Sequence, residues 1–212
     1  MSTHLLDVGL RGTRDYVQGS QILARTAELV EAADPAPSLL VSAKFTRITD
    51  LGVRVVLGGD GLDAEPEIGR AQFARGDART TARFFEVAGP QAGPLADVAP
   101  ATSDLESTGL GGGQAAFAIP GTFESYLAAV IECVKALHAK RGERVSDIWF
   151  TALVGARLPL AATYPTSGVL RVAPKIERLV AGRLQTLSLV DTEATVGDAP
   201  PQFQICFSCV VG

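Results

Sequence analysis

The sequence predicts an α+β protein in which one unit, a strand followed by a helix and then several strands, is used twice. Two long helical segments rich in apolar residues, 16–33 and 122–140, are each preceded by a short strand and followed by alternating strands. Between the two sets lies a stretch of Pro, Gly, Ala, Ser and Thr without periodicity. We therefore predict a first unit at 1–90, a linker at 91–113 and a second unit at 114–212.

The individual elements follow from apolar spacing and from turn residues. In the first unit we predict a strand at 5–10, a helix from Tyr16 to Ala33 with Asp15 as its N-cap, and strands at 39–48, 53–57, 70–75 and 80–87. In the second we predict a strand at 115–119, the helix, and strands around 148–158, 169–173, 183–190 and 203–211. The last strand alternates most clearly, with Phe203, Ile205, Phe207, Cys209 and Val211 on one side.

The evidence for a repeat is the order of the elements. An offset of 109 residues places Gly12 over Gly121 and Asp15 over Glu124, but few residues are identical. The alternative is a single α+β domain whose halves are alike by chance.

Composition restricts the class of function. The chain has a formal net charge of −4, and its nineteen Lys and Arg form no basic stripe, so nucleic acid is not an expected partner. It has no apolar run long enough to cross a membrane and no signal peptide pattern at the N-terminus. We therefore expect a cytoplasmic protein.

The sequence predicts neither a metal centre nor a cofactor. Cys206 and Cys209 have C-x-x-C spacing, but residues three apart in a strand point to opposite faces, so reduced, buried thiols are favoured over a redox or zinc pair. No nucleophile elbow, phosphate-binding loop or dinucleotide fingerprint is present.

A helix that is apolar around most of its circumference requires a sheet curved around it. The segment from Gly12 to Gly19 resembles the stretch that opens the central helix of hot-dog dehydratases and thioesterases, in which an acidic residue or a proline-rich turn precedes a glycine in the first helical turn. The resemblance implies a double hot dog: two curved antiparallel sheets, joined edge to edge, each wrapped around a central helix. It also implies acyl thioesters of coenzyme A or an acyl carrier protein as substrates, in a fatty-acid or polyketide type pathway, and a homodimer or hetero-oligomer.

Candidate site residues surround the two helix starts. Gly19 lacks a Cβ, so a substrate carbonyl could approach the N–H groups of the first turn, although such a glycine also lets a strand pack closely. Its counterpart is Ala128, so any chemistry is expected mainly in the first half. Asp15 and Glu124 are candidate acids or bases, or simply helix caps. The candidate catalytic residues are Asp15, Tyr16, Glu124 and His4, and the candidate substrate-binding residues are Arg14, Gln18, Gly19 and Ser125.

The histidines depart from the dehydratase pattern. Hot-dog dehydratases carry a His in the loop before the helix, whereas this chain has only His4 and His138. We expect His138, near the end of the second helix, to be structural. Three hypotheses remain: a dehydratase-like enzyme, with its pocket where a helix start meets the neighbouring unit, a thioesterase that activates water, and a non-catalytic protein that binds an acyl chain or a partner subunit.

Overall fold

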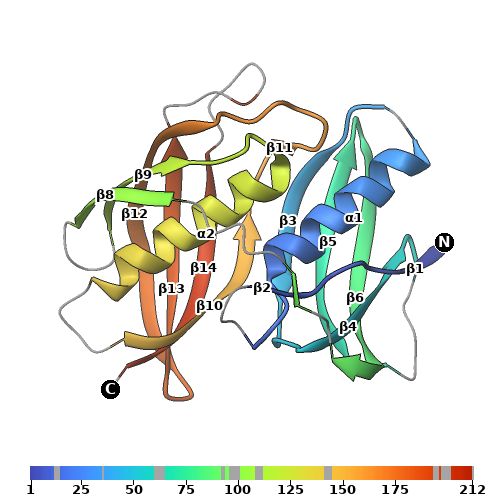
Figure 1. The fold of residues 1–212 in the computed structure, drawn as a ribbon, viewed down its shortest axis with the longest axis horizontal. Coiled ribbons are helices and arrows are strands. Elements are labelled where there is room, and N and C mark those ends of the chain that lie inside the picture. Colours follow the sequence, from blue (N-terminus) through green and yellow to red (C-terminus); the bar gives the residue numbers. More distant parts are fainter. Residues whose placement is uncertain are drawn as a thin grey trace. The chain divides into compact units, whose positions relative to one another are not determined.

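A computed structural model describes residues 1–11, 15–34, 36–59, 65–91, 94–95, 101–107, 112–140, 145–192, 196 and 202–211. The chain forms two compact units. The first is Met1–Val98 with Pro159–Ala161, and the second is Ala99–Leu158 with Ala162–Gly212. Each unit contains one long helix lying against an antiparallel sheet (Figure 1).

The first unit has α1 against a five-stranded sheet in the order β1-β4-β6-β5-β3. A short parallel pair, β2 with β7, lies outside this sheet. The core of this unit includes Val53, Val55 and Val56 of β4, which are fully buried, and the rings of Phe45 and Phe84, which stack with their centroids 5.7 Å apart. The elements are β1 (Ser2–Leu5), β2 (Leu10–Arg11), α1 (Gly19–Ala33), β3 (Leu39–Phe45), β4 (Leu51–Leu57), β5 (Glu67–Arg75), β6 (Ala78–Gln91) and β7 (Pro94–Leu95).

Arg75, the last residue of β5, anchors the end of α1. Its guanidinium donates to the backbone oxygens of Val30 and Asp34 at 3.2 and 2.8 Å and to the Ser38 hydroxyl at 3.1 Å. It also pairs with the Asp34 carboxylate at 2.5 Å. The carbonyls that a helix end leaves without intrahelical partners are thus bonded from the sheet.

The second unit has α2 against a sheet in the order β10-β14-β13-β12-β9-β8. The predicted alternation of the last strand is confirmed, because Phe203, Ile205, Phe207 and Cys209 are all at most 2% exposed. The elements are β8 (Ala101–Ser107), β9 (Gly113–Ala118), α2 (Phe123–Ala139), β10 (Val145–Val154), β11 (Leu158–Pro159), β12 (Ser167–Val180), β13 (Arg183–Thr192) and β14 (Gln202–Val211).

The two units share the order of their elements and differ in how the central strands pair. Each has a strand, a helix and then four long strands. In the first unit the central order is β4-β6-β5, so that β4 pairs with β6, which is two strands later in the chain. In the second the central order is β12-β13-β14, in which each strand pairs with its immediate successor.

Three sequence-based expectations are corrected. The first helix begins at Gly19 and not at Tyr16, because residues before it are held extended by contacts with other segments. The first strand is Ser2–Leu5 and not 5–10. Within the predicted linker 91–113, residues 101–107 form β8, which pairs with β9 through the backbone and therefore needs no apolar pattern.

The helix starts also revise the alignment of the two halves. The N-caps are Gln18 and Thr122, which are 104 residues apart. Asp15 therefore precedes the α1 cap by three residues, whereas Glu124 lies inside α2, and the two acids are not equivalent. No helix among the described residues is long and apolar enough to cross a membrane.

Candidate functional site

The start of α1 carries backbone donors without acceptors. Gln18, the N-cap, has extended backbone angles (φ −76°, ψ 138°), and its side chain does not cap the helix. Its carbonyl oxygen accepts from the N–H groups of Gln21 at 3.1 Å and Ile22 at 3.3 Å. The N–H groups of Gly19 and Ser20 have no acceptor among the described residues. The first turn also lacks an acidic residue, so the positive end of the helix dipole is uncompensated there.

Two contacts set where α1 begins. Leu10 of β2 forms an antiparallel bridge with Val17, and the Val17 N–H donates to the Thr49 carbonyl at 2.8 Å. These bonds hold Val17 extended, and Gln18 is extended as well, so the helix begins at Gly19. Because Gly19 is the first helical residue and has no Cβ, its own side chain does not screen these donors.

A buried amide lies in the same turn. Ser20 and Gln21 are 2% and 1% exposed. Gln21 Oε1 accepts from the buried N–H of Gly9 at 3.1 Å, which fixes the amide orientation because only the oxygen can accept. Its Nε2 has no hydrogen-bond partner among the described residues. A buried donor left in this state costs about 1–3 kcal/mol.

The start of α2 is closed by its own cap. The Thr122 hydroxyl accepts from the Ser125 N–H at 3.1 Å, and the Ser125 hydroxyl accepts from the Thr122 N–H at 2.9 Å. This capping box satisfies two donors that a ligand would otherwise use. Glu124, a predicted catalytic residue, is the second residue of α2 and is partly buried. The hydroxyl of Ser125, a predicted substrate-binding residue, is occupied by the cap, which argues against that role.

Aromatic rings fill the space around the same turn of α2. Tyr126 lies 4.8 Å from Tyr164 between ring centroids, Phe123 lies 5.9 Å from Tyr164, and Phe117 lies 6.1 Å from Tyr126. Burial raises the pKa of Tyr126. The two helix starts thus differ: α2 has a capping box, an acidic residue in its first turn and aromatic packing, while α1 has neither a side-chain cap nor an acidic residue in its first turn.

Of the other predicted residues, Asp15 and Tyr16 precede α1 in the chain and His4 lies in β1. Asp15 is exposed and does not cap the helix, and Tyr16 is partly buried. His4 is in β1 opposite Val55 of β4, and so shares the face of the sheet on which Val55 is buried. In the described part of the chain no hydrogen bond or ion pair joins His4, Asp15 and Tyr16 to one another. Arg14 lies outside the described residues.

His138, Cys133 and Cys209 belong to the core, and Cys206 is partly buried. His138 is fully buried, its Nε2 is 3.3 Å from the Thr186 hydroxyl, and its ring lies 5.7 Å from Phe207. Burial raises the pKa of Cys133 to about 12 and also raises that of Cys206. All three cysteines are free thiols. Among the described residues, no group of three His, Cys, Asp or Glu side chains could hold a metal ion.

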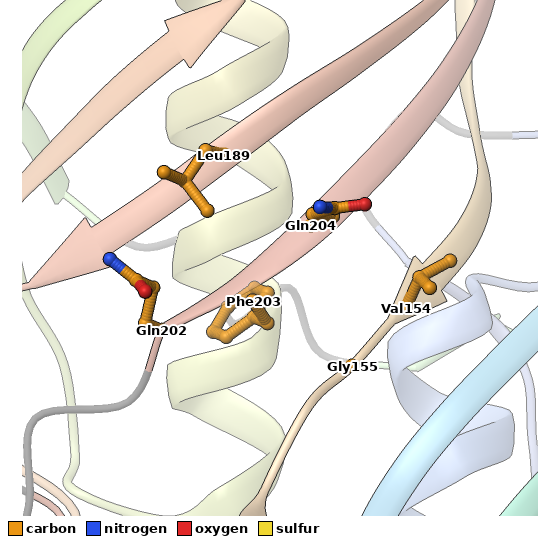
Figure 2. Close-up of a pocket in the computed structure, with 6 residues that line it drawn as sticks. All are labelled: Val154, Gly155, Leu189, Gln202, Phe203 and Gln204. Atoms are coloured by element: carbon orange, nitrogen blue, oxygen red, sulfur yellow. The ribbon is translucent and has the colours of Figure 1, made fainter. Parts of the chain in front are cut away.

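Two pockets lie in the second unit and contain none of the predicted residues. One has a volume of about 230 Å³ and is drawn in Figure 2, where Gln202 and Gln204 of β14 flank it together with the end of β10. It is lined by Val154, Gly155, Leu189, Gln202, Phe203 and Gln204. The other, of about 280 Å³, is lined by Ile176, Arg178, Gln185, Thr186, Leu187 and Cys206. Both volumes fall below the roughly 300–1,000 Å³ of typical ligand pockets, and the described residues that line them include no carboxylate and no histidine.

Sequence reasoning missed Gln21. The signal was present, because α1 was predicted to be enclosed on most sides, so that some of its polar side chains had to lie against the core. The polar residues in its first turn were therefore candidates for a site.

The fold matches solved structures across nearly the whole chain. The tesB protein of Mycobacterium avium subs paratuberculosis gives a TM-score of 0.53 at 10% identity, over 97% of this chain and 91% of that one. The dehydratase domain from the CurJ module of curacin polyketide synthase gives 0.51 at 9% identity, over 100% and 91%. A protein of Novosphingobium aromaticivorans assigned as a thioesterase gives 0.51 at 11% identity, over 99% and 94%. These are hot-dog structures, so the chain has a hot-dog fold. No protein-family model and no curated protein matches the sequence.

Proposed function

We propose that this chain is a double hot-dog enzyme that acts on an acyl thioester of coenzyme A or an acyl carrier protein, with the thioester carbonyl oxygen bound at the start of α1. The observation that carries the proposal is the difference between the two helix starts. The first turn of α1 has no side-chain cap and no acidic residue, and the N–H groups of Gly19 and Ser20 have no acceptor among the described residues, whereas the start of α2 has a capping box and an acidic residue. The names of the structural neighbours, which include a dehydratase domain and a thioesterase, support the same substrate class.

A carbonyl oxygen is the ligand that such a turn suits. Two N–H donors and the positive helix end stabilise negative charge that develops on the oxygen during reaction. A single donor of this kind is worth roughly 10²–10³ in kcat in enzymes where it has been removed.

The reaction that we propose is elimination of water from a 3-hydroxyacyl thioester. Polarising the carbonyl acidifies the neighbouring C–H. A base removes that proton, the resulting electron pair forms the double bond, and the 3-hydroxyl group leaves as water after taking up a proton. The candidates for proton transfer are Asp15, three residues before the α1 cap, and His4 on the inner face of the sheet.

Hydrolysis of the thioester is the second candidate, and the exposure of Asp15 favours it. A carboxylate in contact with solvent can deprotonate a water molecule, which then attacks the polarised carbonyl and releases the thiol. Both reactions use the same carbonyl site.

Incubation with 3-hydroxyacyl and saturated acyl coenzyme A thioesters distinguishes a dehydratase from a thioesterase and from a non-catalytic acyl-binding protein. Mass spectrometry detects loss of water, and a thiol reagent detects release of coenzyme A. We expect loss of water from the 3-hydroxyacyl thioester, and a decrease of at least tenfold in the Gly19→Val variant, whose branched side chain covers the first turn. Thiol release without dehydration would favour the hydrolase. Binding without turnover would identify a non-catalytic acyl-binding protein, and neither binding nor turnover would refute the proposal.

A further inference from the structure

Gln21 has a donor that nothing in the described protein uses. Its side chain is buried, its oxygen is occupied by the Gly9 N–H, and its Nε2 is left without a partner. We infer that the Gln21 amide group is a third donor to the thioester carbonyl oxygen, beside the N–H groups of Gly19 and Ser20. The inference rests on the proposed function and adds a side chain to its site.

The position of Gln21 in the helix directs its amide toward the helix start. It is the third residue of α1, and side chains of α-helices lean toward the N-terminus, over the preceding turn. Gly9, which holds the amide oxygen, directly precedes Leu10, the residue that bridges to Val17 just before the helix. The hydrogen bond with Gly9 thus holds the amide oxygen, and we infer from the lean of the side chain that Nε2 faces the turn of Gly19 and Ser20.

The chemistry of the free group limits what it can bind. An amide –NH₂ only donates, so its partner must supply an acceptor oxygen. The free N–H groups of Gly19 and Ser20 make the same demand in the same turn. One carbonyl oxygen, which has two lone pairs and gains charge in the reaction, can accept from converging donors of this kind.

The competing explanation is that Gln21 only clamps Gly9. Gln21→Glu separates the two, because a carboxylate still accepts from the Gly9 N–H but, when ionised, donates nothing. A clamp would survive this change. A carbonyl donor would be lost at pH 8 and would return in part at lower pH, where the protonated acid can donate.

The experiment measures binding by calorimetry with two coenzyme A probes. One is a ketone analogue, in which a methylene group replaces the thioester sulfur and the carbonyl is retained; the other is the matching S-alkyl coenzyme A, which has no carbonyl. We expect the wild type to prefer the ketone, and Gln21→Glu at pH 8 to bind it about tenfold more weakly, with S-alkyl binding unchanged. Ketone affinity of the variant should rise as the pH is lowered.

The two probes distinguish a failure of the proposed carbonyl site from a failure of the role of Gln21. If the wild type binds both probes equally, or neither, the carbonyl site itself is refuted, and Gln21 with it. If the wild type prefers the ketone and Gln21→Glu keeps that preference, only the role of Gln21 is refuted. The same conclusion follows if the variant binds both probes more weakly by the same factor. Should Gln21→Glu not fold, Gln21→Met takes its place; it fills a similar volume but has neither the amide donor nor the amide acceptor for Gly9. We expect it to lose the preference for the ketone, and a retained preference would refute the role of Gln21.

Discussion

Giving α1 the cap that it lacks should stabilise the protein and inactivate it. In Gln18→Asp the backbone already has N-cap geometry, so the new carboxylate can accept the N–H of Ser20 or Gln21. Capping residues contribute about 0.5–2 kcal/mol and a charge at the positive helix end about 0.3–1 kcal/mol. We expect a net gain of about 1 kcal/mol.

The same carboxylate should disable the carbonyl site. It takes up first-turn donors and places a negative charge beside the oxygen on which charge develops. At a separation of about 4 Å and an effective dielectric constant of about 20, this repulsion is about 4 kcal/mol, so even with strong screening turnover should fall more than tenfold.

The assay follows urea unfolding by the fluorescence of Trp149, the single tryptophan, together with turnover of the 3-hydroxyacyl thioester. The matched control is Thr122→Ala, which removes the cap of α2; it should cost about 1 kcal/mol and leave turnover within about twofold. Gln18→Asp with raised stability and undiminished turnover would refute the reasoning, because the donors would then be irrelevant to activity.

Two further predictions concern stability. Measured by urea unfolding, Arg75→Met should lower the free energy of unfolding by about 2 kcal/mol and Asp34→Asn by less than about 0.5 kcal/mol. The reason is that the hydrogen bonds of Arg75 to backbone carbonyls contribute more than its exposed ion pair with Asp34, and equal losses would contradict this. Burial raises the pKa of Cys133 from 9.0 to about 12 and raises that of Tyr126, so both remain protonated in the folded state while the unfolded chain ionises. The contribution of these two groups to the free energy of unfolding is full below pH 9 and is lost as the pH rises from 9 towards 12. In Cys133→Ala the free energy of unfolding should therefore fall less steeply between pH 9 and 10.5. An unchanged slope would count against burial of Cys133 as the cause.

The fold was predictable to the level of its elements because burial patterns are local. The alternation of Phe203, Ile205 and Phe207 predicted β14, and the all-round apolar helices predicted enclosure by a sheet. Helix and strand boundaries were less predictable where they depend on distant segments. Val17 is held extended by Leu10 and Thr49, which no local pattern reveals, and β8 is held by backbone pairing with β9.

The site was predictable only in part for a related reason. Gly19 was identified because a glycine in a first helical turn is unusual, and it does begin α1. Asp15 was assigned as the cap by residue preference, but the cap is decided by where the backbone leaves the extended state, and that is Gln18. The state of Gln21 depends on Gly9, twelve residues earlier, so its free amide could be seen only in three dimensions.

The different pairing of the central strands gives the two units different folding routes. In the second unit β12, β13 and β14 form a meander of neighbouring hairpins, which can assemble by short loop closures within microseconds. In the first unit neither partner of β4 is its neighbour in the chain: β1 precedes it by the whole of α1 and β3, and β6 pairs with it only across the loop that contains β5. Ordering that longer loop raises the entropic cost of its transition state, so we expect the second unit to acquire hydrogen-exchange protection first during refolding. The unit that carries the proposed active site would then be the slower to form.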